Sequence, residues 1–274
     1  MDMKGRVLVV AGSDSGGGAG IQADIKTITA LNGFAMTAIT ALTAQNSLGV
    51  KGVHKPPPAF VTDQIRVTLE DLGADAVKTG MMADAPIIEA AAEALEEYAG
   101  GVPWIVDPVM FSSARDLLLD EDAAEALKAR LVSRAALVTP NMPEAEALIG
   151  RPVATVADME AAGQDLLDLG AGAALVTGGH LGGDTVTDVL VTADGAERFE
   201  GPRIDTPHTH GTGCTLASAV ATGLAQGMEL RDCVIRARAY VREAIRTAPG
   251  YGAGHGPLNH AHTVRPFGDG SDAM

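Results

Sequence analysis

One segment combines the residue types of a phosphate site with a cysteine. Residues 208–215 read His-Thr-His-Gly-Thr-Gly-Cys-Thr, and small apolar residues continue to Ala221. A glycine turn that opens a helix leaves backbone N–H groups unpaired, and the helix dipole adds positive charge there, so phosphate binds well. The same field favours the thiolate of Cys214. We predict a phosphate site with Cys214 as a base beside it. The alternative is a glycine-capped turn with Cys214 as a small buried hydrophobe.

Length, charge and cysteine content narrow the class of protein. The chain has 274 residues, a formal net charge of −15 and two cysteines. We expect one α/β domain over residues 1–266 with a flexible tail at 267–274. The negative charge disfavours nucleic acid and anionic membranes as partners. The N-terminal apolar run, Val7 to Ala11, is too short for a signal peptide, and no segment is long enough to span a membrane, so we predict a cytoplasmic protein without a disulfide framework.

Strand-like and helix-like segments alternate along the chain. Short apolar or β-branched runs predict strands at Val7–Val10, Met36–Thr43, Trp104–Val106, Leu137–Val138, Leu175–Val176 and Val186–Val191. Helical patterns fall at Gly20–Asn32, Pro58–Leu72, Ala85–Ala99, Asp122–Val132, Val156–Leu169, Thr215–Gln226 and Asp232–Thr247. This order predicts a three-layer α/β fold with a mostly parallel central sheet and helices on both faces.

Polar or glycine-rich segments follow four of the predicted strands. They are residues 12–20, 107–110, 139–144 and 177–180. Ligands of open α/β sheets bind at the carboxyl ends of strands, so four such ends indicate a shared crevice. The glycines at 16–20 are either a flexible loop or a structured turn, and the helical pattern that starts at Ile21 favours the turn. Neither a G-x-G-x-x-G pattern nor a P-loop is present, so a nucleotide would bind without either motif.

The segment from Ala11 to Thr27 resembles the opening of the hydroxymethylpyrimidine kinase/phosphomethylpyrimidine kinase family, which is part of the ribokinase-like superfamily. Further similarity lies at residues 39–46, 78–82, 106–110, 139–145, 178–180, 209–215 and 254–260. The resemblance implies a ribokinase-like fold and a homodimer. It also implies ATP- and Mg²⁺-dependent phosphorylation of 4-amino-5-hydroxymethyl-2-methylpyrimidine, and then of its monophosphate to the pyrophosphate, in thiamine biosynthesis.

The family's roles carry over to matching positions. Cys214 corresponds to the base for the substrate hydroxyl, and the backbone amides of Gly211, Thr212 and Gly213 to the anion hole. Gln45 corresponds to the side chain that pairs with the aminopyrimidine edge. The positions that line the pyrimidine site are Gly12, Asp24 and Met81. The family's nucleotide-binding positions correspond to Asn141, Glu144, Thr177 and Thr209, and its Mg²⁺ positions correspond to Asp107 and Glu144.

Several of these residues also have purely structural interpretations. Met81 and Met82 would pack in the core, Gln45 would be a solvated amide, Asp24 a charge on a helix surface, and Asp107 part of a turn. The chain also departs from the family pattern: Thr177 stands where many members have lysine. Residues 111–116, which include Ser113 and Arg115, replace an Ala-Lys-Ser-Gly-Asp stretch. Two cations near the ATP phosphates are therefore missing, and Arg115 replaces at most one of them.

Two other functions compete with the pyrimidine kinase. Pyridoxal kinase on the same scaffold would place a pyridine ring against Gln45 and the two methionines. A non-catalytic ligand-binding or thiol-sensing module would use Cys214 as its thiol, but a sensor has no need for Asp107, Asn141 and Glu144. Turnover of both alcohols would separate the two kinases, and failure to consume ATP would favour the sensor.

Overall fold

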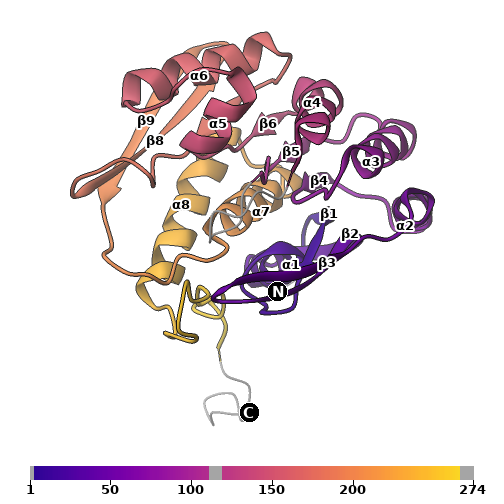
Figure 1. The fold of residues 1–274 in the computed structure, drawn as a ribbon, viewed down its shortest axis with the longest axis horizontal. Helices are drawn as coiled ribbons and strands as arrows, with labels where there is room; N and C mark the ends of the chain where they lie inside the picture. Colours follow the sequence, from indigo (N-terminus) through magenta and orange to yellow (C-terminus); the bar gives the residue numbers. More distant parts are fainter. Residues whose placement is uncertain (1–2, 111–118, 266–274) are drawn as a thin grey trace.

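A single sheet runs through the protein (Figure 1). The computed structural model describes residues 3–110 and 119–265. Within them the nine strands lie in the order β3-β2-β1-β4-β5-β6-β7-β8-β9. Their bounds are β1 Arg6–Asp14, β2 Phe34–Asn46, β3 Gly49–His54, β4 Ala76–Thr79, β5 Trp104–Val106, β6 Leu137–Val138, β7 Ala174–Val176, β8 Thr185–Thr192 and β9 Gly195–Pro202.

The centre of the sheet is parallel and its margins are antiparallel. β1 pairs in parallel with β2 and β4, and parallel pairing continues from β4 to β7. β3 pairs antiparallel with β2 at one margin, and β8 and β9 continue antiparallel from β7 at the other. The prediction of a mostly parallel sheet is confirmed.

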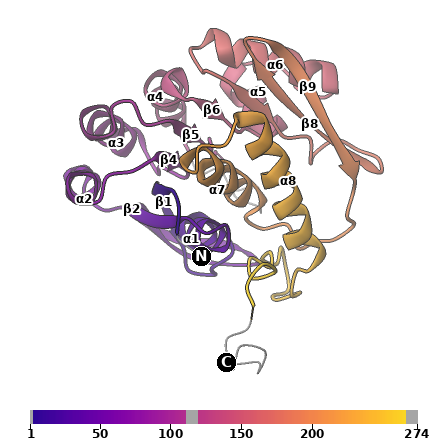
Figure 2. The ribbon, with the colours of Figure 1, turned by 180° about the vertical axis from the view of Figure 1, so that it is seen from behind.

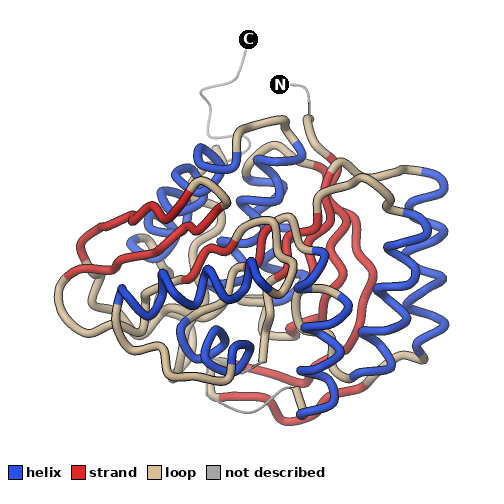
Figure 3. The backbone as a smooth tube through the Cα atoms, turned by 90° about the horizontal axis from the view of Figure 1, so that it is seen from above, coloured by secondary structure: helices blue, strands red, loops and turns tan. Residues whose placement is uncertain are grey.

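Helices cover both faces of the sheet (Figure 3). They are α1 Gly20–Ala30, α2 Pro58–Asp71, α3 Ala85–Tyr98, α4 Glu121–Arg130, α5 Met142–Ile149, α6 Val156–Asp168, α7 Thr212–Ala225 and α8 Leu230–Arg246. Side chains alternate along β1, so Leu8 and Val10 pack in the same core as α2 to α6, whereas Val7 and Val9 pack with α1, α7 and α8. The three-layer architecture is confirmed. Figure 2 shows α7 and α8 side by side on the second face.

α7 is the most deeply buried helix near the predicted site. Every residue from Thr215 to Gly223 is buried, which explains the small side chains in this stretch. The helix begins at Thr212, three residues before the predicted start, because Gly211 is its N-cap residue with a φ of 86°. Gly213 and Cys214 therefore lie in the first helical turn and not in a loop before it.

Four elements were absent from the sequence prediction: β3, β4, β9 and α5. β4 has four residues and includes a lysine, and β9 is a margin strand whose residues are mostly exposed and include Glu197, Arg198 and Glu200. α5 has eight residues with Pro143 in its first turn. Each is too short or too polar to give a clear hydrophobic period.

The described residues include no helix that is long and apolar enough to cross a membrane. All nine strands of the described residues belong to one continuous sheet, but the single domain over residues 1–266 stays a prediction. Its predicted tail, residues 267–274, lies outside the described residues, as do Ser113 and Arg115.

Candidate active site

The segment between β1 and α1 is a structured turn built around Asp14. The Asp14 carboxylate accepts hydrogen bonds from the backbone N–H groups of Gly16 (2.7 Å), Gly18 (3.0 Å) and Ala19 (2.8 Å). Burial alone would raise the pKa of Asp14, but these bonds and one from His210 outweigh it, so the pKa is lowered. The prediction of a structured turn is confirmed.

The start of α7 packs directly against this turn. A Cβ atom on Gly211 would lie 1.9 Å from the carbonyl oxygen of Gly18, so no other residue fits there without a shift of the backbone. Gly211 has no side chain to cap the helix. The Thr212 amide bonds to the Thr209 carbonyl at 3.3 Å, whereas the Gly213 amide belongs to the first turn, whose N–H groups have no partner within the helix. Gly213 is exposed, so an anion can reach this helix end.

Cys214 lies where the N-terminal ends of α1 and α7 meet. The backbone of Gly20, the first residue of α1, hydrogen-bonds to the cysteine. Burial nevertheless raises the pKa of the thiol, Asp107 and Asp24 raise it further, and Lys78 and Gly20 oppose the rise without cancelling it. The pKa of Cys214 is thus raised in the ligand-free protein, and not lowered as the helix field alone would predict, because burial and two nearby carboxylates outweigh Lys78 and Gly20.

A buried ion pair lies beside the cysteine. Lys78 on β4 and Asp24 on α1 are both 0% exposed, and the Lys78 Nζ atom lies 3.1 Å from Asp24 Oδ1 and 3.4 Å from Asp107 Oδ2. Ser218, one turn after Cys214 on α7, donates a hydrogen bond of 2.7 Å to Asp24. Burial opposes the charge on Lys78, but Asp24, Cys214 and Asp107 outweigh it and raise the pKa of the lysine.

This geometry corrects one interpretation of the sequence and adds a residue to the site. Asp24 is not a charge on a helix surface, because it is fully buried. It lies beneath the cysteine in contact with a lysine and is not on an open pocket wall. Lys78 had no assigned role in the sequence analysis, although a lysine inside a short strand flanked by apolar residues was a visible signal.

The ends of β1, β4 and β2 carry the three other residues assigned to the pyrimidine: Gly12, Met81 and Gln45. The N–H of Gly12 donates to the Met81 carbonyl (3.0 Å), and a Cβ atom on Gly12 would lie 2.8 Å from the Met81 sulfur. Met81 is partly exposed, whereas Met82 is 1% exposed and packs in the core. The core interpretation is therefore right for Met82, and only Met81 is available to a ligand. The Gln45 side chain is partly buried and lies 3.3 Å from the His210 ring, so it is not a solvated amide.

The residues assigned to the nucleotide and Mg²⁺ follow the ends of β5, β6 and β7, except for Thr209. Asn141 caps α5 and forms a capping box with Glu144, whose Oε2 accepts from the Asn141 N–H (2.9 Å). Thr177 pairs with Asn141 across β7 and β6. Thr209 is exposed in the segment before α7. Asp107, which follows β5, is buried and also acts electrostatically on Glu144.

Glu144 and Asp107 are two buried carboxyl groups that repel each other, and Asp107 also faces Lys78 at 3.4 Å. Burial raises the pKa of Glu144 to about 8, and the charge of Asp107 adds to the rise. Among the described residues, Oδ2 of Asp107 has no hydrogen-bond partner, and neither have the buried hydroxyls of Thr79 and Thr139 at the two adjacent strand ends. Within the same residues, no group of three or more His, Cys, Asp or Glu side chains is arranged to hold a metal ion. Protein ligands alone therefore do not complete a metal site here.

Comparison with known proteins identifies the family. The model of the family described as phosphomethylpyrimidine kinase matches residues 14–259. This chain belongs to that family. The hydroxymethylpyrimidine/phosphomethylpyrimidine kinase of Bacillus subtilis is 45% identical over 256 residues, which cover 93% of this chain and 94% of that protein. The predicted family, with its kinase activity and its link to thiamine biosynthesis, is confirmed at the level of the family.

Two further relatives differ in length or in substrate. The thiamine biosynthesis bifunctional protein ThiED of Geobacter sulfurreducens is 51% identical over 258 residues, and the match spans 94% of this chain but 52% of that protein. An ADP complex of Bacillus subtilis pyridoxal kinase has a TM-score of 0.86 at 36% identity, with 94% of this chain and 98% of that chain covered. The ribokinase-like fold is thereby confirmed, and pyridoxal kinase is a relative on the same scaffold.

Proposed function

We propose that this protein transfers the γ-phosphoryl group of ATP to the hydroxyl of 4-amino-5-hydroxymethyl-2-methylpyrimidine, and then a second one to the resulting monophosphate. The observation that carries the proposal is the position of Cys214. Its thiol lies at the joined N-terminal ends of α1 and α7, beside the Lys78, Asp24 and Asp107 charges. Family membership supplies the reaction class.

The site supplies what phosphoryl transfer requires. The reaction needs alignment and stabilisation of spread negative charge more than covalent chemistry. The first-turn amides of α7 provide donors for the oxygens of the transferred group. Cys214 accepts the proton of the substrate hydroxyl as that oxygen bonds to the γ-phosphorus and ADP leaves. Cys214 can accept that proton only as a thiolate, so its own proton must pass to solvent before the transfer. Lys78 and the Gly20 backbone favour the thiolate, and neutralisation of the Asp107 charge would remove one cause of the raised pKa.

The residues present fit Mg²⁺ together with a nucleotide. Mg²⁺ prefers oxygen ligands and is held by one or two carboxylates, while phosphate and water complete its shell. Asp107 and Glu144 would hold it, because Oδ2 of Asp107 accepts no hydrogen bond from the described residues and faces Lys78 only at 3.4 Å, and because burial and the charge of Asp107 push Glu144 toward the neutral form. When bound, Mg²⁺ neutralises charge on the ATP phosphates. Asn141, Thr177 and Thr209 would contact the nucleotide.

Pyridoxal phosphorylation is the second candidate, and the pyridoxal kinase similarity favours keeping it. Both substrates are flat heterocyclic alcohols that fit between Met81 and Gln45. A thiol sensor fits less well, because it has no need for Asp107, Asn141 and Glu144, which lie near one another at the strand ends.

A homodimer is also part of the proposal. Leu42, Leu48 and Val53 are exposed on the hairpin of β2 and β3, at a margin of the sheet where another chain can pack. Light scattering on the purified protein should give twice the chain mass of 27.9 kDa. A cytoplasmic location stays a prediction.

The test is an ADP-release screen with a panel of pyrimidine and pyridoxal alcohols, ATP and Mg²⁺. The aminopyrimidine alcohol and its monophosphate should give the highest kcat/KM. Faster turnover of pyridoxal would reverse the assignment, and no ADP release with any alcohol would favour a binding or sensing module.

A further inference from the structure

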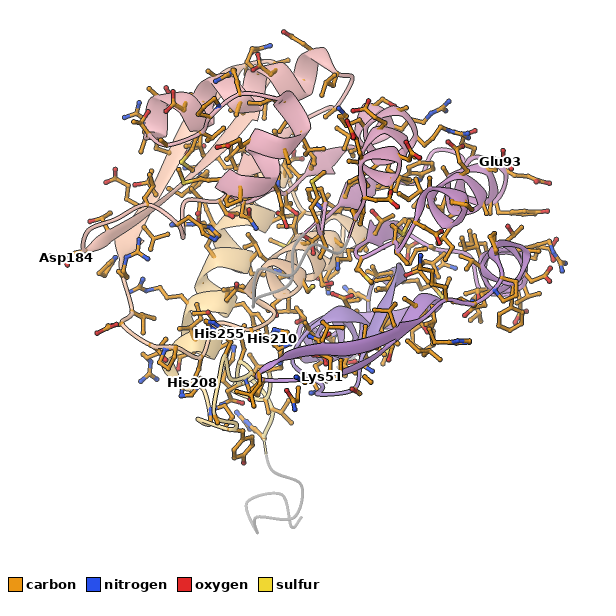
Figure 4. All side chains as sticks on the ribbon, viewed as in Figure 1. Lys51, Glu93, Asp184, His208, His210 and His255 are labelled. Carbon is orange, nitrogen blue, oxygen red and sulfur yellow. The ribbon has the colours of Figure 1, made fainter. Side chains whose placement is uncertain are left out.

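Two side chains flank the carboxamide of Gln45, one at each end. Its Nε2 lies 3.3 Å from Nε2 of His210, and its Oε1 lies 3.2 Å from the hydroxyl oxygen of Thr43. Figure 4 shows His210 where the segment before α7 meets the β2–β3 hairpin that carries Lys51. The hydrogen-bond chemistry of these two neighbours decides which way the carboxamide points.

His210 presents a protonated ring nitrogen to Gln45, and its one hydrogen is shared between Asp14 and the carboxamide. The same ring nitrogen lies 2.9 Å from Oδ2 of Asp14, which is a carboxylate that also accepts from Gly18 and Ala19. An ionised carboxylate has no proton to give, so the hydrogen of this contact sits on His210 Nε2. With Nε2 of Gln45 beside it, two N–H groups would face each other. The oxygen of the carboxamide is therefore the atom that belongs next to His210.

Thr43 leads to the same orientation from the other end. Its hydroxyl donates to the carbonyl oxygen of Ser13 (2.9 Å), and a carbonyl can only accept. A hydroxyl has one hydrogen, so the Thr43 oxygen has only lone pairs to offer Gln45. An acceptor needs the NH₂ group of the carboxamide next to it. A half-turn of the amide, which exchanges O and N in nearly the same places, satisfies both neighbours.

We infer that His210, held by Asp14, and Thr43 are positioning residues that fix the orientation of the Gln45 carboxamide and thereby the substrate pattern that it accepts. A carboxamide offers two N–H donors and two lone pairs. Thr43 takes one donor and His210 takes one lone pair, so one of each remains. This inference rests on the proposed function, in which Gln45 faces the heterocycle.

The free N–H donor and the free lone pair of the Gln45 carboxamide match a substrate edge with its donor and acceptor in one order. They repel an edge with the reverse order. A 4-aminopyrimidine offers an amine donor beside a ring-nitrogen acceptor. Its 4-oxo analogue has a carbonyl acceptor beside a ring N–H donor, with almost the same shape. A locked carboxamide distinguishes the two, whereas a carboxamide that is free to turn accepts both.

The segment around His210 shows how the His210 ring, and with it the orientation of the Gln45 carboxamide, is kept fixed. His210 is buried, its backbone N–H bonds to the Gly256 carbonyl, and its ring lies so close to Gly18 that a Cβ atom there would be 2.6 Å from Cδ2. The ring is thus held from the C-terminal segment and from the β1–α1 turn. A donor can select one of the two amide orientations only if its ring is held in place.

The experiment compares the 4-amino alcohol with its 4-oxo analogue in the parent, His210→Phe, Thr43→Val and His210→Gln. The measurements are kcat/KM with ATP and the Kd of each pyrimidine by calorimetry without ATP. His210→Phe should reduce the amino-over-oxo preference by about tenfold or more, since one lost hydrogen bond corresponds to such factors. Thr43→Val should reduce it in the same direction. His210→Gln retains an N–H and should keep most of the preference.

His255→Phe is the matched control. This exposed histidine lies beside the same segment, with its ring 3.3 Å from the Pro207 carbonyl, and none of the hydrogen bonds among the described residues joins it to Gln45. It should leave the preference unchanged. An unchanged preference in both His210→Phe and Thr43→Val would overturn the inference, as would a parent that binds both pyrimidines equally. If His210→Phe does not fold, Thr43→Val decides alone. A parent that prefers the 4-amino compound in calorimetry but releases no ADP would refute the proposed function and leave the orientation inference standing.

Discussion

Replacement of Lys78 by methionine tests the charge arrangement beneath Cys214. The change keeps an unbranched side chain that is one atom shorter and removes the ammonium, which leaves Asp24 and Asp107 buried without a counter-charge. At a separation of 3.1 Å and an effective dielectric constant of about 20, the attraction to Asp24 is about 5 kcal/mol. Breaking a buried pair costs roughly 3–5 kcal/mol of folding free energy. We therefore expect a loss of that size at pH 8.

The loss should depend on pH with a definite sign. Burial already raises the pKa of Asp24, and removal of Lys78 raises it further. An acid whose pKa is higher in the folded state than in the unfolded state favours folding at low pH, and that contribution disappears as pH rises through the folded pKa. The destabilisation by Lys78→Met should therefore be larger at pH 8 than at pH 5. Urea unfolding at both values measures it.

A surface pair and a double variant provide the comparison. Lys55 lies 2.8 Å from Asp84, which is a shorter contact than Lys78 makes, but Lys55 is largely exposed. Lys55→Met should cost less than about 1 kcal/mol. The double variant Lys78→Met with Asp24→Asn should recover at least half of the lost folding free energy, because it removes the buried Asp24 charge together with the Lys78 ammonium that paired with it. The reasoning is refuted if Lys78→Met costs no more than Lys55→Met, or costs the same at pH 5 and pH 8.

Three further substitutions test individual roles. In the ligand-free protein, Glu144→Gln should stabilise the fold by about 1–4 kcal/mol at pH 9 and by little at pH 4.5. The pKa of the Glu144 carboxyl is raised to about 8, so its contribution to folding is lost as pH rises through that value, whereas glutamine stays neutral and keeps the capping box. Equal gains at both pH values would contradict this. Thr177→Lys should tighten ATP binding by ~1.5–3 kcal/mol through a charge-assisted contact, either in the parent or, if Arg115 already supplies that cation, in an Arg115→Ala variant. An unchanged ATP Kd in both backgrounds would mean that Thr177 does not face the phosphates. Gln45→Leu should weaken pyrimidine binding by roughly 1–3 kcal/mol and spare ATP, and calorimetry that shows an equal loss of ATP affinity would rule out its role.

Regular features of the chain made most of the fold predictable. The alternation of apolar strands with amphipathic helices indicated the layers, and the strand at Trp104–Val106 ends where expected. β4 was missed because a lysine interrupts its apolar pattern, although the sheet buries that lysine with two carboxylates. A buried charge of this kind depends on partners 54 residues away on α1 and on the next strand, and periodicity does not contain that information.

The candidate site was predictable to the extent that it depends on residue types at strand and helix ends. The Cys214 segment and the capping residues Asn141 and Glu144 could be located in this way. The protonation of Cys214 could not be predicted, because it depends on the sum of burial and three charges from different elements. His210 and Asp14, 196 residues apart, meet only in the folded chain.

The most direct test of the account is the turnover of the aminopyrimidine alcohol by Cys214→Ala at saturating ATP, Mg²⁺ and substrate. The account predicts that kcat falls by ~10²–10⁴-fold, the usual contribution of a positioned base, while the Kd of the substrate and the free energy of unfolding change little. If the alanine variant turns over the alcohol at close to the parent rate, Cys214 is not the base and the proposed chemistry of the site is wrong.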